Sequence, residues 1–95
     1  MRGASHLMSD EIRTAVIAIL ADRALCDPSD VRMDQSPAEL GLDSLGVVET
    51  IFAIEERFDI SVPFNANAPA ATDFDISSTA AIVAAVERLV ADQRG

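Results

Sequence analysis

The feature that most constrains the fold is the recurrence of apolar side chains at helical spacing in three separate segments. The first segment places an apolar side chain at positions i, i+3, i+4, i+7 and i+8: Ile12, Ala15, Val16, Ile19 and Leu20. Ser9 is the expected N-cap of this helix, and Asp10 and Glu11 follow in a first turn that favours negative charge. The helix is expected to end near Arg23 or Leu25.

The second segment predicts a helix from about Ser44 to Arg57. One stripe is expected to face the core and holds Val47, Ile51, Ile54 and Phe58. A neighbouring stripe mixes apolar and acidic side chains: Leu45, Val48, Glu49, Phe52, Glu55 and Glu56. An acid between apolar neighbours argues against complete burial of this second stripe. The mixture is typical of a protein-docking surface, and the alternative is a solvated edge with incidental apolar exposure.

The third segment follows Ser77 or Ser78, either of which suits an N-cap. Its helical repeat consists of Thr79, Ile82, Val83, Val86, Leu89 and Val90. Because the chain has no strand pattern and no internal repeat, these segments predict an all-α fold, a small bundle of three to four helices. The last helix is also rich in alanine (Ala80, Ala81, Ala84 and Ala85). These side chains could leave a slot for an apolar ligand, although helix propensity explains them equally well.

Two connections join the three segments. Residues 26–43 predict a long first loop, in which Asp27-Pro28 breaks the first helix. Within it, Ser36-Pro37-Ala38-Glu39 has the pattern of a capping box and predicts one short turn, with Leu40 reaching the core. Residues 63–75 are small, polar and interrupted by proline, and they predict one further turn at most, around Ala70–Phe74.

Charge excludes several classes of partner. Sixteen acids face seven arginines and no lysine, so the net charge is −9, or −10 when Arg2 is set aside. Such a surface repels nucleic acid and anionic membrane and suits partners with basic docking patches. Cys26 is the only cysteine, which excludes an internal disulfide and argues against a metal cluster. We therefore expect no bound metal and no membrane insertion, and we expect a monomer.

The N-terminal residues and the hydropathy of the sequence lead to further expectations. The first seven residues, MRGASHL, look like a cloning remnant ahead of a native start at Met8. We expect residues 1–7 to be disordered and residues 8–95 to form one domain. The sequence has no apolar run that could span a membrane and no secretory signal, so we expect a cytoplasmic protein.

The run Gly41-Leu42-Asp43-Ser44-Leu45 is the strongest local motif. A serine at a helix N-terminus lies where backbone N–H groups and the helix dipole favour an attached anion. The five residues alone also fit a plain helix start. A hydrolase built on Ser44 would need a base, and the sequence has no lysine and no histidine beyond His6. We therefore expect the chain not to be an enzyme.

This run resembles the G-x-D-S-L attachment motif of acyl carrier proteins, and the similarity continues to Pro63. Glu49, Glu55-Glu56, Phe58-Asp59 and Val62-Pro63 stand where these carriers have an acid, an acid pair, F-D and an apolar-Pro pair. The resemblance implies a bundle of the acyl-carrier type in which the Ser44 hydroxyl carries 4′-phosphopantetheine from coenzyme A, whose thiol holds cargo as a thioester.

The resemblance also implies roles for neighbouring residues. Asp43 would help to place the phosphopantetheinyl transferase and its metal; the alternative is a simple N-cap, and the two roles are compatible. Partners would be that transferase and acyl-loading and condensing enzymes with basic patches. They would dock on Leu45, Val48, Glu49, Phe52, Glu55 and Glu56.

Departures from the family pattern bear on the cargo. Leu42 stands where peptidyl carriers more often have glycine, which favours fatty-acyl or polyketide cargo over aminoacyl cargo. Gly46 and Arg57 stand where the housekeeping fatty-acid carrier usually has acids, and residues 63–75 also depart from the family. These differences suggest a specialised lipid or secondary-metabolite carrier. The alternatives are an aminoacyl or peptidyl carrier and an unmodified acidic interaction module.

Overall fold

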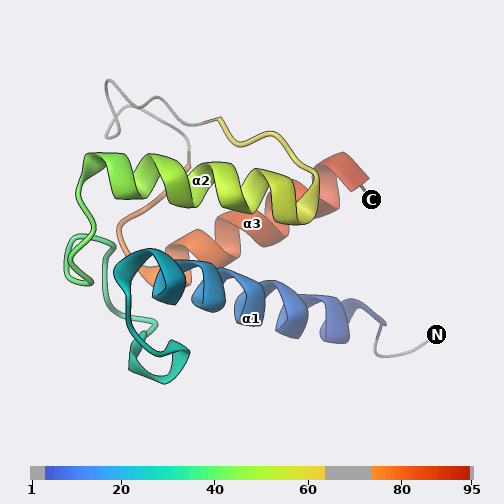
Figure 1. The fold of residues 1–95 in the computed structure, drawn as a ribbon. Coiled ribbons are helices and arrows are strands. Elements are labelled where there is room, and N and C mark those ends of the chain that lie inside the picture. Colours follow the sequence, from blue (N-terminus) through green and yellow to red (C-terminus); the bar gives the residue numbers. More distant parts are fainter. Residues whose placement is uncertain (1–3, 64–73, 95) are drawn as a thin grey trace.

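The computed structural model describes residues 4–63 and 74–94. These residues form helix α1 (Ala4–Ala24), a short 3₁₀ helix η1 (Pro28–Asp30), helix α2 (Ser44–Phe58) and helix α3 (Thr79–Arg94) (Figure 1). Helices α1 and α2 run in opposite directions, and α3 runs diagonally between them (Figure 1). No strand occurs in the described ranges, so the predicted all-α bundle with a long first loop is confirmed. None of the described helices combines the length and the hydropathy needed to cross a bilayer.

Helix α1 begins earlier than the sequence predicted. It starts at Ala4, so the expected start after Ser9 was wrong. A serine followed by acids favours a helix start but does not stop a helix that is already formed, and residues 4–8 contain no proline or glycine. The assignment of residues 1–7 to a cloning remnant stays a prediction.

The end of α1 is confirmed and closes in a Schellman turn. The Cys26 N–H donates to the Ala21 carbonyl at 3.0 Å, and the Leu25 N–H donates to the Asp22 carbonyl at 3.4 Å. Leu25 has a left-handed backbone with φ 60°. This turn directs the chain into the first loop.

The first loop is held by local and distant hydrogen bonds. The predicted capping box is confirmed: the Ser36 N–H donates to Glu39 Oε1 at 2.8 Å, and the Glu39 N–H donates to Ser36 Oγ at 3.2 Å. The Gln35 carbonyl accepts from the Thr79 N–H at 2.7 Å and from Thr79 Oγ1 at 3.0 Å. These two bonds fix the loop to the start of α3.

The core is formed by the predicted stripes of all three helices. Its members from the helices include Ile12, Val16, Leu20, Ile51, Ile54, Phe58, Ile82, Val86 and Val90. Val47 and Leu40 pack against this core as expected, although both are only partly buried, and Leu42 is the fully buried leucine of the loop. Thr50 is also buried, and its hydroxyl donates to the Gly46 carbonyl at 2.9 Å, which satisfies the side chain within the helix.

Helix α3 is capped by Ser78, whose Oγ accepts from the Ala81 N–H at 3.0 Å. The sequence left two explanations for the four alanines of this helix, a slot or helix propensity; Ala80 and Ala84 are exposed and Ala85 is buried in the core. The four therefore do not share one slot. The turn expected at Ala70–Phe74 lies outside the described residues except for Phe74, which is buried.

Candidate functional site

The approach to α2 is a tight turn that depends on Gly41. Gly41 has φ +92°, a left-handed conformation that glycine adopts without a steric cost. The Gly41 N–H donates to the Ala38 carbonyl and the Leu42 N–H donates to the Pro37 carbonyl, both at 3.0 Å. The buried Leu42 side chain anchors the chain immediately before Asp43. The position of Asp43-Ser44 is therefore fixed from the preceding side.

Asp43 is the N-cap of α2. Its backbone is extended (φ −91°, ψ −172°), and its Oδ1 accepts from the Gly46 N–H at 2.8 Å. Its backbone carbonyl accepts from the Val47 N–H at 2.9 Å, the first bond of the helix. The expected capping role of Asp43 is thus confirmed, whereas its role toward a transferase stays a prediction.

Ser44 is the first helical residue and is exposed. Within the described part of the chain, no hydrogen bond involves its hydroxyl or its backbone N–H. The first N–H groups of a 15-residue helix lie beside this hydroxyl, and they and the helix dipole favour a negatively charged substituent. A phosphodiester on Ser44 would therefore break no described hydrogen bond.

The outward face of α2 carries two large exposed apolar side chains. Leu45 is 64% exposed and Phe52 is 59% exposed. Glu49 and Glu56 are exposed on the same face, four residues after Leu45 and Phe52 respectively. We call Leu45, Glu49, Phe52 and Glu56 the outward face.

The other two residues expected on this surface lie at its edge. Val48 and Glu55 are half-buried, and Glu55 Oε2 accepts from the Val62 N–H at 2.8 Å. Glu55 therefore holds the segment that leaves α2, a role that the stripe pattern did not indicate because its partner lies beyond the helix. The structure thus separates four outward residues from two residues at the edge.

Arg23 is a neighbour that sequence reasoning missed. Its Nη1 lies 3.7 Å from Glu49 Oε1, and its Nη2 lies 2.8 Å from Asp22 Oδ2. The hydrogen bond that Arg23 donates to Asp22 and the negative charge of Asp22, with a smaller contribution from Glu49, raise the pKa of Arg23 above its usual value. The ion pair ties the end of α1 to the second turn of α2. No local pattern indicates a pair 26 positions apart.

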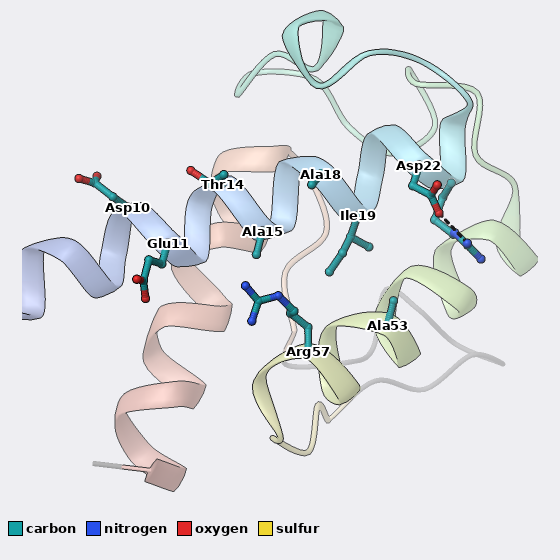
Figure 2. Close-up of a pocket in the computed structure, with 10 residues that line it drawn as sticks. Asp10, Glu11, Thr14, Ala15, Ala18, Ile19, Asp22, Ala53 and Arg57 are labelled. Atoms are coloured by element: carbon teal, nitrogen blue, oxygen red, sulfur yellow. Dashed lines mark hydrogen bonds and ion pairs between the residues drawn. The ribbon is translucent and has the colours of Figure 1, made fainter.

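A hollow lies between α1 and α2 (Figure 2). This groove has a volume of about 740 Å³. Figure 2 shows Arg57 reaching from α2 toward α1, with Ala15 and Ile19 above it. A smaller hollow of about 310 Å³ is lined by Pro63, Phe74, Ala85, Arg88 and Leu89. Ser44 lines neither hollow.

The metal-ligating and thiol side chains of the described residues form no second candidate site. Among the described residues, no three His, Cys, Asp or Glu side chains are placed to hold a metal ion. Cys26 is a half-buried free thiol. Ser44 and its neighbours are therefore the arrangement that points to a function.

Comparisons with known proteins place this arrangement in a family. The family model described as "Phosphopantetheine attachment site" matches residues 14–67, which is more than half of the chain. An acyl carrier protein of Clostridium acetobutylicum is 46% identical over 46 residues. That alignment covers 47% of this chain and only 60% of the relative's length. No solved structure matches. The matched segment contains the capped start of α2, and the chain belongs to the acyl carrier protein family, whose phosphopantetheine-attachment domain carries covalently bound 4′-phosphopantetheine.

Proposed function

We propose that Ser44 is the attachment point of the phosphopantetheine arm and that the protein carries acyl groups on it. The observation that supports this most is the Ser44 hydroxyl, which is exposed and without a described partner at the N-terminus of α2. It lies inside the segment that the family model matches. When bound, the arm supplies a terminal thiol that holds cargo as a thioester.

The residues around Ser44 suit its modification by a second protein. Ser44 Oγ would attack the pantetheine-side phosphorus of the coenzyme A pyrophosphate, the P–O bond to the other phosphate would break, and adenosine 3′,5′-bisphosphate would leave, so that a phosphodiester remains on Ser44. The transferase would supply the base that takes the serine proton, because the sequence has no lysine and no histidine except His6. Asp43 uses Oδ1 for the helix cap, and no hydrogen bond from a described residue reaches Oδ2. Asp43 can therefore cap the helix and also offer one oxygen to a transferase-bound metal. In this proposal the protein is a substrate of its partners rather than an enzyme.

A modification assay tests the attachment point. Incubation with coenzyme A and a broad-specificity phosphopantetheinyl transferase should add one phosphopantetheinyl group to the chain, measured by intact mass. Ser44→Ala should gain none. Ser61→Ala is the matched control, because Ser61 is exposed and its described hydrogen bonds use only backbone atoms. Labelling of Ser44→Ala would contradict the proposal.

We also propose that partner enzymes dock on the outward face. Leu45 and Phe52 would supply affinity as apolar anchors, and Glu49 and Glu56 would attract basic patches and raise the rate of encounter. Glu49→Lys and Glu56→Lys should slow modification at low salt and leave the helical CD spectrum unchanged. Asp92→Lys, at an exposed position on α3, is the matched control. Equal rates for all three variants and the wild type would count against this surface.

The cargo we propose is a fatty-acyl, specialised-lipid or polyketide intermediate. Leu42 beside the attachment dipeptide and the departures at Gly46 and Arg57 support this choice. An aminoacyl or peptidyl cargo is the second candidate. We place the carrier in the cytoplasm as a single domain of residues 8–95. Intact-mass analysis of protein recovered from its native cell separates the candidates, because an acyl group and an amino acid add different masses.

A further inference from the structure

The turn that ends α1 has a leucine where glycine is the favoured residue. Leu25 occupies the position after the helix in a Schellman turn, with φ 60°. In this left-handed conformation the Cβ of an ordinary residue crowds the following carbonyl oxygen, and glycine avoids that contact. The backbone at this position is therefore strained by its side chain.

The Leu25 side chain is also almost completely exposed. It is 91% exposed, more than the other two large exposed apolar residues, Leu45 and Phe52. An exposed leucine by itself is ordinary. Leu25 differs because its backbone is strained as well, so neither burial nor local conformation favours leucine here. The stability of the folded chain does not account for this residue.

Leu25 lies at the end of the molecule that carries Ser44. Helices α1 and α2 are antiparallel, so the last turn of α1 and the first turns of α2 lie at the same end (Figure 1). The contact of 3.7 Å between Arg23 and Glu49 joins these two ends. A standard interface covers about 800 Å² on each partner and involves roughly 20–30 residues of each, which is more than the 15 residues of α2. An enzyme that acts on Ser44 therefore extends beyond α2 onto its neighbours.

The charges around Leu25 define the kind of surface that fits it. Asp22, Asp27 and Asp30 are exposed close to Leu25 in sequence, and Arg23, the cation within residues 22–30, is paired with Asp22 and Glu49. Arg32, the next cation along the loop, is paired with Asp34. The complementary surface is an apolar pocket with arginine or lysine at its rim.

We propose that Leu25 is a second docking anchor, inserted into a basic-rimmed apolar pocket of the phosphopantetheinyl transferase that modifies Ser44. This inference rests on the proposed function. It adds a contact on α1 and the first loop to the docking on α2.

Two substitutions at Leu25 separate binding from strain. Leu25→Ala removes the anchor and keeps a strained Cβ, whereas Leu25→Gly removes both. Asp59→Gly is the matched control, because Asp59 follows α2 in the same left-handed conformation, with φ 56°. The measurement is kcat/KM for modification with coenzyme A and a broad-specificity transferase, together with Tm.

We expect both Leu25 variants to lower kcat/KM about tenfold, as for the loss of an interface anchor. Leu25→Gly should at the same time raise Tm by a few degrees, because the strain is relieved. Asp59→Gly should raise Tm and leave kcat/KM within about twofold of the wild type. A variant that is more stable yet modified more slowly would be difficult to explain by damage to the fold.

Wild-type kcat/KM in Leu25→Ala, with Ser44 still modified, would overturn the inference and leave the proposed function intact. Absence of modification in the wild-type chain would overturn the proposed function and the inference with it.

Discussion

Asp43 caps helix α2 and directly precedes Ser44, the proposed attachment residue. Its Oδ1 accepts from the Gly46 N–H at 2.8 Å, and this bond satisfies one of the free donors at the start of α2. Asp43→Ala should therefore destabilise the protein by about 1 kcal/mol, and Asp43→Asn should cost clearly less because asparagine also caps helices. Urea unfolding followed by CD measures both variants. Equal stability of Asp43→Ala and the wild type would show that the cap is not made in solution.

Asp75 gives a pH-dependent contribution that can be measured. The Ser77 hydroxyl and then the Ser77 backbone N–H, which donates to Asp75 Oδ1 at 2.9 Å, hold the pKa of Asp75 below its usual value of 3.8. A carboxyl whose pKa is lower in the folded state stabilises that state above the unfolded pKa. This contribution is lost as pH falls through the folded pKa.

The matching variant is Asp75→Asn, which cannot ionise. The Tm difference between the wild type and Asp75→Asn should be constant above about pH 5 and should shrink as pH falls toward 2. Thermal unfolding at a series of pH values tests this. A difference that grows on acidification would mean that the sign of the pKa shift is wrong.

At the scale of elements, Glu55 connects the end of α2 to the segment that follows it. Its Oε2 accepts from the Val62 N–H at 2.8 Å, beside the pair of hydrogen bonds between Gln93 and Ser61, each 2.8 Å. Glu55→Ala should lose about 1 kcal/mol of stability, whereas Glu55→Gln keeps an acceptor and should lose less. Denaturant unfolding of the two variants measures their free energies of unfolding. If Glu55→Ala is as stable as Glu55→Gln, this contact does not hold the segment.

The elements also show what the sequence could and could not predict. The stripes of α1, α2 and α3 were predictable because burial repeats with the helical period, as Val16, Ile54 and Val86 illustrate. The capping box at Ser36 and the cap at Asp43 were predictable because their partners lie three residues away.

Other features depend on where the chain goes between the helices. The bond from Thr79 Oγ1 to the Gln35 carbonyl spans 44 residues, and the Arg23–Glu49 pair also joins distant segments. Neither contact produces a recognisable pattern in the local sequence. The early start of α1 was missed for the opposite reason, because a good capping sequence at Ser9 need not be used.

At the scale of the whole molecule, charge opposes compaction. A net charge of −9 on 95 residues means that acids repel one another across a small surface. Added NaCl screens this repulsion, so Tm should rise with salt. MgCl₂ should raise Tm as well, because divalent cations gather at the same acids. A Tm that falls with NaCl would mean that attractive pairs such as Arg13–Asp10 outweigh the repulsion.

Ser44 is exposed at the start of α2, directly after the Asp43 cap, and the central claim is that this serine carries the arm. The most direct test uses the unaltered chain after co-expression with a phosphopantetheinyl transferase. Trypsin cleavage after Arg32 and Arg57 releases residues 33–57, which hold both Ser36 and Ser44. Fragmentation of this peptide by tandem mass spectrometry should locate one phosphopantetheinyl group on Ser44. A group located on Ser36, or an unmodified peptide in protein that was co-expressed with an active transferase, would contradict the account.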